Sequence, residues 1–291
     1  MAAAWQDPVD VAVIGGGIIG ICAAAALAAA GRKPLVIDRT GICEETSAGN
    51  AGALAFSDVL PLAQKGMIRN LPKWLADPLG PLSVPPAYAP RLVPWLLRFL
   101  AASRPARYGN ALAAQAAMMR LAETEWAALM ARTGTESMLR EGGSLELYQS
   151  DAEFQASLGG WAARERFNIA FRHLDRAGIE ALQPGLAPQF SRATFVPGWK
   201  TVSDPQNLGK AIWRKAEADG AIWTRGDVVV VTPAGEHVAI QLREGHTLLA
   251  RDLIVAAGAW SHRLTRAFGD VVPLETERGY NTTLPADAFD L

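Results

Sequence analysis

Three glycines near the N-terminus, Gly15, Gly17 and Gly20, have the spacing of a loop that binds the pyrophosphate of a dinucleotide. Residues 9–14 before them are apolar and β-branched and predict a buried strand. Residues 18–30, which include the third glycine, predict an alanine-rich helix. In such a unit the first glycine permits a tight turn, the second lets the pyrophosphate approach the backbone, and the third lets helix and strand pack closely. The helix then offers the phosphates its unpaired N–H groups and the positive end of its dipole.

An acidic residue, Asp38, ends a second predicted strand over 34–38. The two strands and the helix between them predict a βαβ unit with parallel strands. A carboxylate at this position accepts hydrogen bonds from a ribose hydroxyl of the adenosine half. The motif alone does not choose between FAD and NAD. Arg39 also leaves NADP open, because an arginine there can face a 2′-phosphate.

Composition disfavours several other classes of function. Half of the 291 residues are hydrophobic and 20% are charged, which predicts a globular protein with a core. The net charge is −1 and there is no basic tract, so we expect no nucleic-acid partner. The two cysteines and four histidines are scattered, so we expect no metal site and no disulfide framework. A reducing, cytoplasmic compartment fits this cysteine usage.

The stretch 11–31 is uncharged and long enough to suggest a membrane span. Glycines 15 to 17 would break a helix there, and the stretch divides into a strand, a turn and a helix. Acidic rather than basic residues precede it, so it is a poor signal peptide. We therefore expect neither a span nor a leader from this segment.

The segment after Asp38 decides between the possible cofactors. Residues 45–52 read ETSAGNAG, and their backbone amides, hydroxyls and small side chains suit an extended ligand lying close to the chain. This segment resembles the second flavin loop of the D-amino-acid dehydrogenase branch of the FAD-dependent DAO family. Further marks resemble that branch in the same order along the chain: the proline-rich 73–82 and 94–99, GSLELY at 143–148, TVSDPQNL at 201–208, DLIVAAGAWS at 252–261 and ERGY at 277–280.

The resemblance implies FAD as the cofactor. Together the motif and the resemblance predict these cofactor-binding residues: Gly15, Gly17, Ile18, Ile19, Gly20, Asp38, Arg39, Glu45, Thr46, Ser47, Asn50, Ala51, Gly52, Val229, Ala257, Gly258 and Trp260. Val229 is expected near the adenine, although a valine in a strand is as often plain packing. Arg278 and Tyr280 are the candidate catalytic residues facing the substrate. Their spacing puts both on one face of a strand, where they could equally brace a sheet.

The fold class expected is α/β, with a Rossmann-type FAD-binding domain interleaved with an α+β substrate domain that is incomplete at the C-terminus. The FAD-binding domain is assigned to residues 1–60 and 195–262, and the substrate domain to 61–194 and 263–291. A helix is expected from Leu208 and a buried strand over 253–257.

The activity implied is that of a D-amino-acid dehydrogenase-like oxidoreductase. A hydride passes from the substrate Cα to flavin N5, and the imino acid is hydrolysed to a 2-oxo acid and ammonia. The alternatives are a glycine or sarcosine-type amine oxidase and a non-catalytic FAD-binding fragment. Family members continue for about another hundred residues, so we expect the chain ending at Asp290-Leu291 to be truncated and not to turn over D-amino acids at a useful rate.

The apolar segment 85–100 allows two interpretations. Trp95 and Phe99 lie in it beside Arg91 and Arg98, which is typical of an amphipathic helix. We favour a lid under the flavin. The other interpretation is a peripheral contact with the inner face of a membrane, from which electrons would pass to a quinone or another acceptor.

Overall fold

The computed structural model describes residues 7–64, 87–274, 276 and 279, and these form two compact units. The first unit takes its described residues from Met1–Ala53, Ala128–Arg140 and Thr201–Leu291, and the second from Leu54–Ala127 and Glu141–Lys200. Both units interleave along the chain. The predicted α/β class is confirmed, whereas the predicted domain boundaries stay a prediction.

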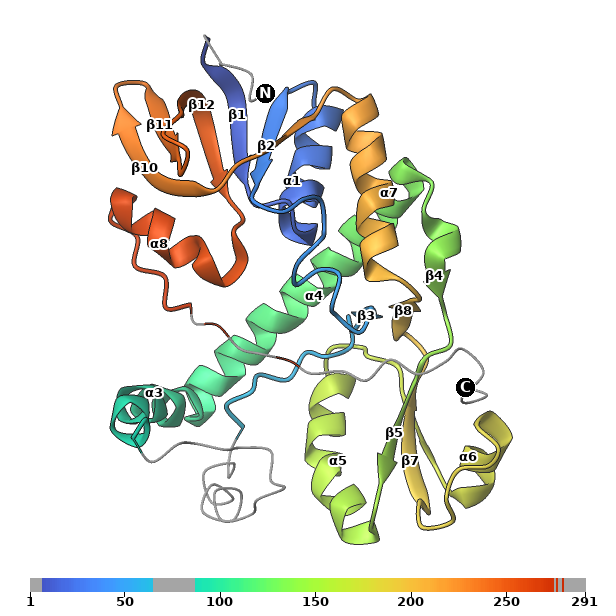
Figure 1. Ribbon diagram of the computed structural model, residues 1–291. Coiled ribbons are helices and arrows are strands. Elements are labelled where there is room, and N and C mark those ends of the chain that lie inside the picture. The colour runs from blue at the N-terminus through green and yellow to red at the C-terminus, as the bar shows by residue number, and fades with distance from the viewer. Residues whose placement is uncertain (1–6, 65–86, 275, 277–278, 280–291) are drawn as a thin grey trace. The chain divides into compact units, whose positions relative to one another are not determined.

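A six-stranded sheet forms the core of the first unit. Its strands are β1 (Val9–Ile14), β2 (Pro34–Asp38), β9 (Ile222–Arg225), β10 (Val228–Ala234), β11 (His237–Leu242) and β12 (Thr247–Val255). They lie in the order β10-β11-β12-β1-β2-β9 (Figure 1). β1 pairs in parallel with both β2 and β12, and β2 pairs in parallel with β9. Because strands of this direction end at one edge, the turns after β1, β2 and β12 meet there.

Two helices, α1 (Ile18–Ala29) and α7 (Pro205–Ala218), pack against each other beside this sheet (Figure 1). Alanines keep α1 slim. A Cβ at Gly209 of α7 would lie 3.4 Å from Ile21 and would press on the Cys43 sulfur, so only glycine permits this approach. The start of α7 differs from the expected Leu208, because Asp204 caps the helix by accepting from Asn207 N at 2.8 Å.

The strand expected over 253–257 in fact begins at Thr247. Its first half pairs antiparallel with β11, and Leu248 and Ala250 point into the core. Its second half pairs in parallel with β1. The first half alternates buried and exposed residues as a hairpin strand does, whereas only the second half has the continuous apolar run of a parallel strand.

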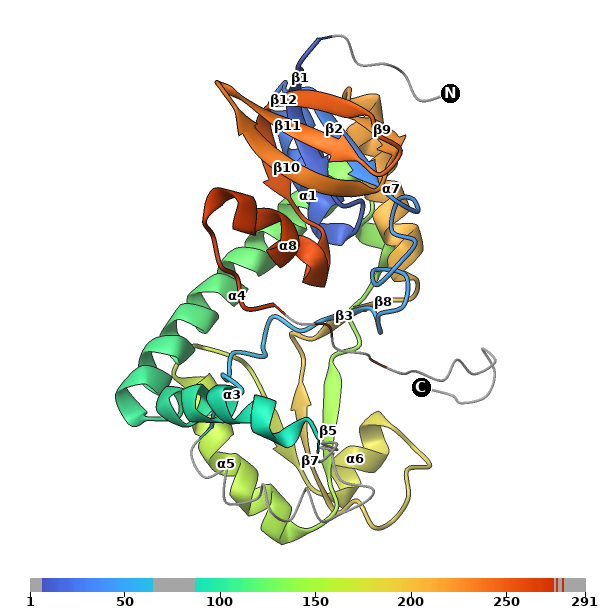
Figure 2. The ribbon, with the colours of Figure 1, turned by 60° about the vertical axis from the view of Figure 1, so that its left-hand side comes forward.

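Short elements complete the first unit. They are β3 (Ala53–Leu54, which reaches the unit boundary), 3-10 helix η1 (Glu136–Met138), β4 (Leu139–Arg140), β8 (Lys200–Val202), η2 (Gly258–Trp260), α8 (Ser261–Thr265) and η3 (Arg266–Phe268). β3, β8 and β4 form a small sheet in that order. Figure 2 shows α8 beside β10, in agreement with their contacts.

The second unit is built on a three-stranded antiparallel sheet in the order β5-β7-β6. Its elements are α3 (Ala89–Ala102), most of α4 (Pro105–Thr133), β5 (Ser144–Tyr148), α5 (Asp151–Glu165), β6 (Arg172–Leu174), α6 (Arg176–Leu182) and β7 (Arg192–Val196). Its buried polar side chains are hydrogen-bonded to one another. Trp161 Nε1 donates to the Tyr148 hydroxyl at 2.7 Å, and the Tyr148 hydroxyl lies 3.1 Å from the Thr194 hydroxyl. Such pairing removes the cost of burying these groups.

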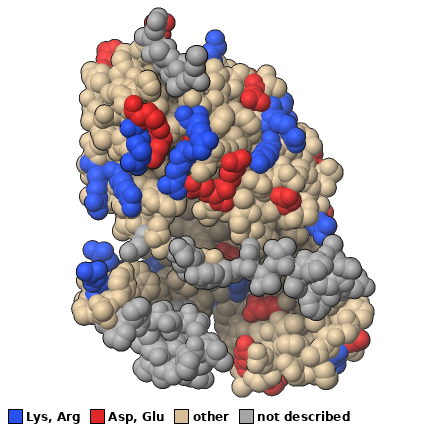
Figure 3. All heavy atoms as spheres, in the orientation of Figure 1, with Lys and Arg blue, Asp and Glu red and all other residues tan. Residues whose placement is uncertain are grey.

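The stretch 11–31 divides into β1, the glycine turn and α1, as the sequence predicted. Within residues 7–64 and 87–274, no helix is both long and apolar enough to cross a bilayer. On the face shown in Figure 3, side chains of both signs intermingle over the first unit.

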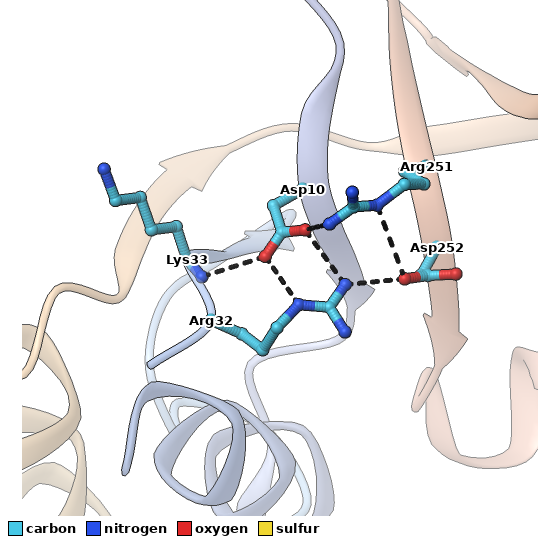
Figure 4. A network of polar contacts seen from close by, with 5 residues as sticks. All are labelled: Asp10, Arg32, Lys33, Arg251 and Asp252. Carbon is cyan, nitrogen blue, oxygen red and sulfur yellow. Dashed lines mark hydrogen bonds and ion pairs between the residues drawn. The ribbon is translucent and has the colours of Figure 1, made fainter. Parts of the chain in front are cut away.

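A charged network holds the amino end of β1 to the middle of β12 (Figure 4). Arg32, just before β2, donates to Asp10 of β1 at 2.7 Å and to Asp252 of β12 at 2.6 Å. Asp10 also accepts from the Lys33 backbone N–H and from Arg251. The hydrogen bond from Arg32, followed by that from Lys33, holds the pKa of the Asp10 carboxyl far below its usual range.

Asp10→Asn should lower the midpoint temperature of unfolding at pH 7. It should also reduce the fall of that midpoint as the pH is lowered. A depressed pKa in the folded state means that the carboxylate stabilises the fold at all pH values above its unfolded pKa of about 3.9. That contribution is lost as the pH falls below this value through the folded pKa. Thermal melts between pH 7 and pH 2 measure both effects.

The control is Glu236→Gln, which removes one charge from the exposed β10–β11 turn. It should follow the wild-type curve. An Asp10→Asn curve parallel to the wild type across the acid range would contradict the role given to the network.

Candidate functional site

The three glycines of the loop after β1 occupy three different environments. Gly15 has a φ of 112°, and a Cβ on it would overlap the Ala256 carbonyl oxygen, so it must be glycine for both reasons. A Cβ on Gly20 would overlap the Gly15 carbonyl oxygen. At Gly17 the nearest atom to a Cβ would be Ser47 Oγ, at 3.3 Å, and the position is otherwise open. The first and third glycines therefore serve packing, and the second leaves space for a ligand.

The N-terminus of α1 is prepared for an anion. Its N-cap, Gly17, has no side chain to cap it, and its first turn carries no acidic residue. Ile18 N donates to Ser47 Oγ at 2.9 Å, which places the Ser47 hydroxyl at the N-terminus of α1, where it also hydrogen-bonds to the Cys43 thiol. The Ile19 side chain is exposed, and its N–H belongs to the first helical turn, where no intrahelical acceptor exists.

Asp38 organises two loops at once. Its Oδ2 accepts from Gly16 N at 2.7 Å, and its Oδ1 accepts from Thr40 N at 2.8 Å, Thr40 Oγ1 at 2.9 Å and Gly41 N at 3.1 Å. Oδ2 retains a lone pair for a ribose hydroxyl. Sequence reasoning missed Gly16, whose Cβ would lie 3.1 Å from the Asp38 Cβ. The sequence did contain a signal, because Gly16 stands between the first two glycines of the motif, Gly15 and Gly17.

Arg39 and Glu45 come from the connection that follows β2, and Trp260 comes from η2, yet the three side chains meet. Arg39 Nε and Nη2 donate to the two Glu45 carboxylate oxygens, each at 2.7 Å. The Arg39 guanidinium carbon lies 4.6 Å from the centre of a Trp260 ring, within the range of a cation–π contact. The hydrogen bonds to Glu45 raise the pKa of Arg39 above its already high value.

The predicted flavin loop, residues 45–52, is braced internally and held to β8. Asn50 Nδ2 donates to the Ser47 carbonyl and Asn50 Oδ1 accepts from Gly52 N, both at 2.7 Å. Gly52 has a φ of 71°, and its carbonyl accepts from Val202 N at 2.8 Å. Thr46 and Ala51 lie within this loop, and the Thr46 carbonyl accepts from Gly49 N at 3.2 Å.

The other predicted site residues differ in what the structure says of them. Ala257 and Gly258 follow Ala256, which contacts Gly15, so this turn borders the glycine loop. Val229 is 37% exposed on β10, next to an irregularity in its pairing with β11. Its place near an adenine stays a prediction. Arg278 and Tyr280 lie outside the described residues, so their catalytic role also stays a prediction.

Thiol and metal chemistry have little support in the described part of the chain. Burial raises the pKa of Cys22 to about 12 and that of Cys43 to about 11, so both thiols are protonated at neutral pH and poor nucleophiles. No cluster of three or more His, Cys, Asp or Glu side chains suited to a metal occurs among residues 7–64 and 87–274. A hollow of about 370 Å³ opens between the loop after β2 and α7, and none of the three motif glycines lines it.

The residues present fit FAD. The open face at Gly17, the first turn of α1 and the Ser47 hydroxyl beside it would form a cradle for a pyrophosphate. Asp38 has a free acceptor position for the ribose, and the braced loop 45–52 offers amides and hydroxyls to an extended chain.

Comparison with known proteins assigns the family. The family model described as "FAD dependent oxidoreductase", DAO, matches residues 10–290. The chain belongs to the DAO family. FAD as the cofactor of this family confirms the cofactor predicted from the sequence, and an oxidoreductase is confirmed as the class of enzyme.

Curated members of the DAO family are similar to the chain over most of its length. A D-amino-acid oxidase of Bradyrhizobium diazoefficiens is 30% identical, with 94% of this chain and 66% of that protein covered. A D-amino acid dehydrogenase of Agrobacterium fabrum is 30% identical, with 95% and 67% covered. The chain therefore spans about two thirds of the length of these curated relatives.

Solved structures share the DAO fold. Glycine oxidase from Geobacillus kaustophilus has a TM-score of 0.62 at 23% identity, with 91% of this chain and 59% of that chain covered. L-amino acid deaminase from Proteus vulgaris has a TM-score of 0.64 at 15% identity, with 94% and 53% covered. At these identities the likeness concerns the fold.

Gly17→Val should abolish FAD binding and leave the secondary structure intact. The new methyl groups would fill the open space in which the pyrophosphate must approach the backbone. Calorimetry with FAD measures the binding, and circular dichroism measures the fold.

The matched control is Gly109→Val in α4, where an added Cβ meets no atom within 4 Å. It should bind FAD as the wild type does. Undiminished FAD affinity in Gly17→Val would contradict the assignment of the glycine loop as the pyrophosphate-binding site.

Proposed function

We propose that this protein oxidatively deaminates D-amino acids with FAD as its cofactor. The observation that carries the proposal is the pyrophosphate cradle at Gly17 in a chain whose curated relatives at 30–31% identity are named for D-amino-acid oxidation or dehydrogenation. NADP is disfavoured as the nucleotide because Glu45 already binds the Arg39 side chain.

The residues of this chain serve chiefly to bind and orient the cofactor. The amides of the glycine loop and the Ser47 hydroxyl would hold the phosphates, Asp38 would accept from the ribose, and loop 45–52 would run along the chain that leads to the ring. When bound, FAD supplies a two-electron acceptor for the hydride that leaves the substrate Cα. No side-chain base is needed for that step if the substrate amine arrives neutral, which agrees with a site built for positioning.

A glycine or sarcosine-type amine oxidase is the second candidate. The fold likeness to glycine oxidase favours it, although the substrate pocket is not defined by the described residues. Arg278 and Tyr280 are proposed to face the substrate in either case. A third candidate is a protein that binds FAD without catalysing amine oxidation.

For the electron acceptor, we propose a quinone reached by peripheral contact with the cytoplasmic face of the inner membrane; dioxygen is the acceptor in the oxidase alternative. The observation behind membrane contact is the apolar face of α3. Val93, Leu97 and Leu100 lie on this face and are 43–61% exposed. Trp95 is 50% exposed on the other side of the helix and stacks on Phe99 with ring centres 4.9 Å apart.

The charged residues in the sequence segment that contains α3 are all positive. Residues 81–122 contain five arginines and no acidic residue, in a chain whose net charge is −1. Near an anionic bilayer surface each such arginine contributes about 1 kcal/mol of attraction. A helix with an apolar face and arginines beside it is typical of a segment that lies in the membrane interface.

The purified protein should be yellow, and D-alanine or D-phenylalanine should bleach its flavin absorbance under anaerobic conditions. L-Alanine is the matched control and should leave the flavin oxidised. Bleaching by glycine or sarcosine instead would favour the second candidate. Bound flavin that none of these amines reduces would favour the non-catalytic candidate. A protein with no affinity for flavin would contradict all three candidate functions.

Leu97→Glu should weaken sedimentation with phosphatidylglycerol vesicles, because a carboxylate would enter the apolar face of α3. Binding of the wild type should fall as salt rises, since the arginines act through screened charge. Leu182→Glu, at the exposed end of α6, is the control and should bind as the wild type does.

Equal sedimentation of both variants, or no vesicle binding by the wild type, would contradict membrane contact. If Leu97→Glu instead slows flavin reduction by D-alanine without any vesicle binding, the lid interpretation of this segment gains support.

A further inference from the structure

One guanidinium in the first unit is shared between an acid and an aromatic ring. Arg39 makes two parallel hydrogen bonds of 2.7 Å to Glu45, and its flat face lies 4.6 Å from the Trp260 ring centre. A bidentate pair of this kind is among the strongest that arginine forms. Arg39 therefore has its charge neutralised, one hydrogen-bonding edge occupied and one face contacted by Trp260.

The cluster of Arg39, Glu45 and Trp260 lies at the carboxyl edge of the sheet, next to the residue proposed to bind the ribose. Arg39 directly follows Asp38, whose Oδ2 is the proposed acceptor for the ribose. In dinucleotide sites an acid at this point selects a free ribose hydroxyl, whereas an arginine close by accommodates a 2′-phosphate. This chain carries both, in adjacent positions, so the state of the arginine decides which nucleotide fits.

The charges around Arg39 are mostly negative. Asp38 and Asp227 add their charges to that of Glu45. Two cations offset part of this charge: Arg243 Nε donates to Asp227 at 2.7 Å, and Arg225 Nε donates to the Arg39 carbonyl at 3.0 Å. A 2′-phosphate would thus meet the Arg39–Glu45 pair, which has no net charge, and the adjacent Asp38 carboxylate, and like charges repel.

We propose that Glu45 is the specificity-determining residue of the adenosine half of the site: by holding Arg39, it makes the site accept an unmodified ribose and reject a 2′-phosphate. The proposal rests on the proposed binding of FAD. It gives Glu45 a task apart from contact with the cofactor, because selection against a competitor requires a repulsive element as well as an attractive one.

Competition against bound FAD by two matched nucleotides tests the proposal. The probes are adenosine 5′-monophosphate and adenosine 2′,5′-bisphosphate, which differ only in the 2′-phosphate. In the wild type the bisphosphate should compete on the order of tenfold more weakly than the monophosphate, and Glu45→Gln should bring the two to parity or reverse them, because a freed arginine gains a charge-assisted bond to phosphate.

Glu44→Gln is the matched control. Glu44 precedes Glu45, carries the same charge, and lies 3.8 Å from Lys210, so its loss should leave the wild-type ratio unchanged. Adding Arg39→Met to Glu45→Gln should return the ratio toward the wild-type value. A ratio that stays at parity in this double variant would show that Arg225, not Arg39, receives the phosphate, and would overturn the proposal.

The outcomes separate this proposal from the proposed function. If FAD and the monophosphate bind but Glu45→Gln leaves the ratio unchanged, the role of Glu45 is wrong and FAD binding stands. The same holds if the wild type does not discriminate at all. If neither FAD nor the monophosphate binds, the proposed function is wrong and the role of Glu45 falls with it.

Discussion

Close packing of two backbone turns sets the geometry of the cofactor cradle. The parallel pairing of β1 with β12 brings Gly15 against the carbonyl of Ala256, an approach that any side chain would prevent. Gly20 then lets α1 pack onto Gly15. These two contacts aim the first turn of α1 at the open space beside Gly17. The cradle therefore depends on absent side chains more than on charged ones, which agrees with its role of admitting a pyrophosphate to the main chain.

Polar interactions then hold both ends of this arrangement. At the carboxyl edge of the sheet, Asp38 ties the glycine loop to the turn after β2, and Arg39 joins the flavin loop to the turn after β12 through Glu45 and Trp260. At the amino end of β1, Arg32 bridges β1 and the middle of β12. A ligand at the edge thus meets loops whose positions are already constrained, which lowers the entropy cost of ordering them on binding.

Membership of the DAO family explains why so few side chains here look catalytic. The reactive chemistry belongs to FAD, and the protein supplies position and electrostatics. The first unit contains the residues proposed to bind the nucleotide part of FAD. Arg278 and Tyr280, which we propose to face the substrate, lie outside the described residues.

The sequence alone determined the βαβ unit, the glycine loop and the acid at the end of β2, because each depends on short-range pattern: apolar periodicity, glycine spacing and a strand end. It also indicated the family through ordered local marks. Only the tertiary structure decided that Gly16 binds Asp38, that β12 serves both a hairpin and the parallel sheet, and that Arg39 is held by Glu45 and Trp260. The sheet order brings Gly16 to Asp38 and Trp260 to Arg39, and no local pattern specifies which partner a long charged side chain such as that of Arg39 will choose.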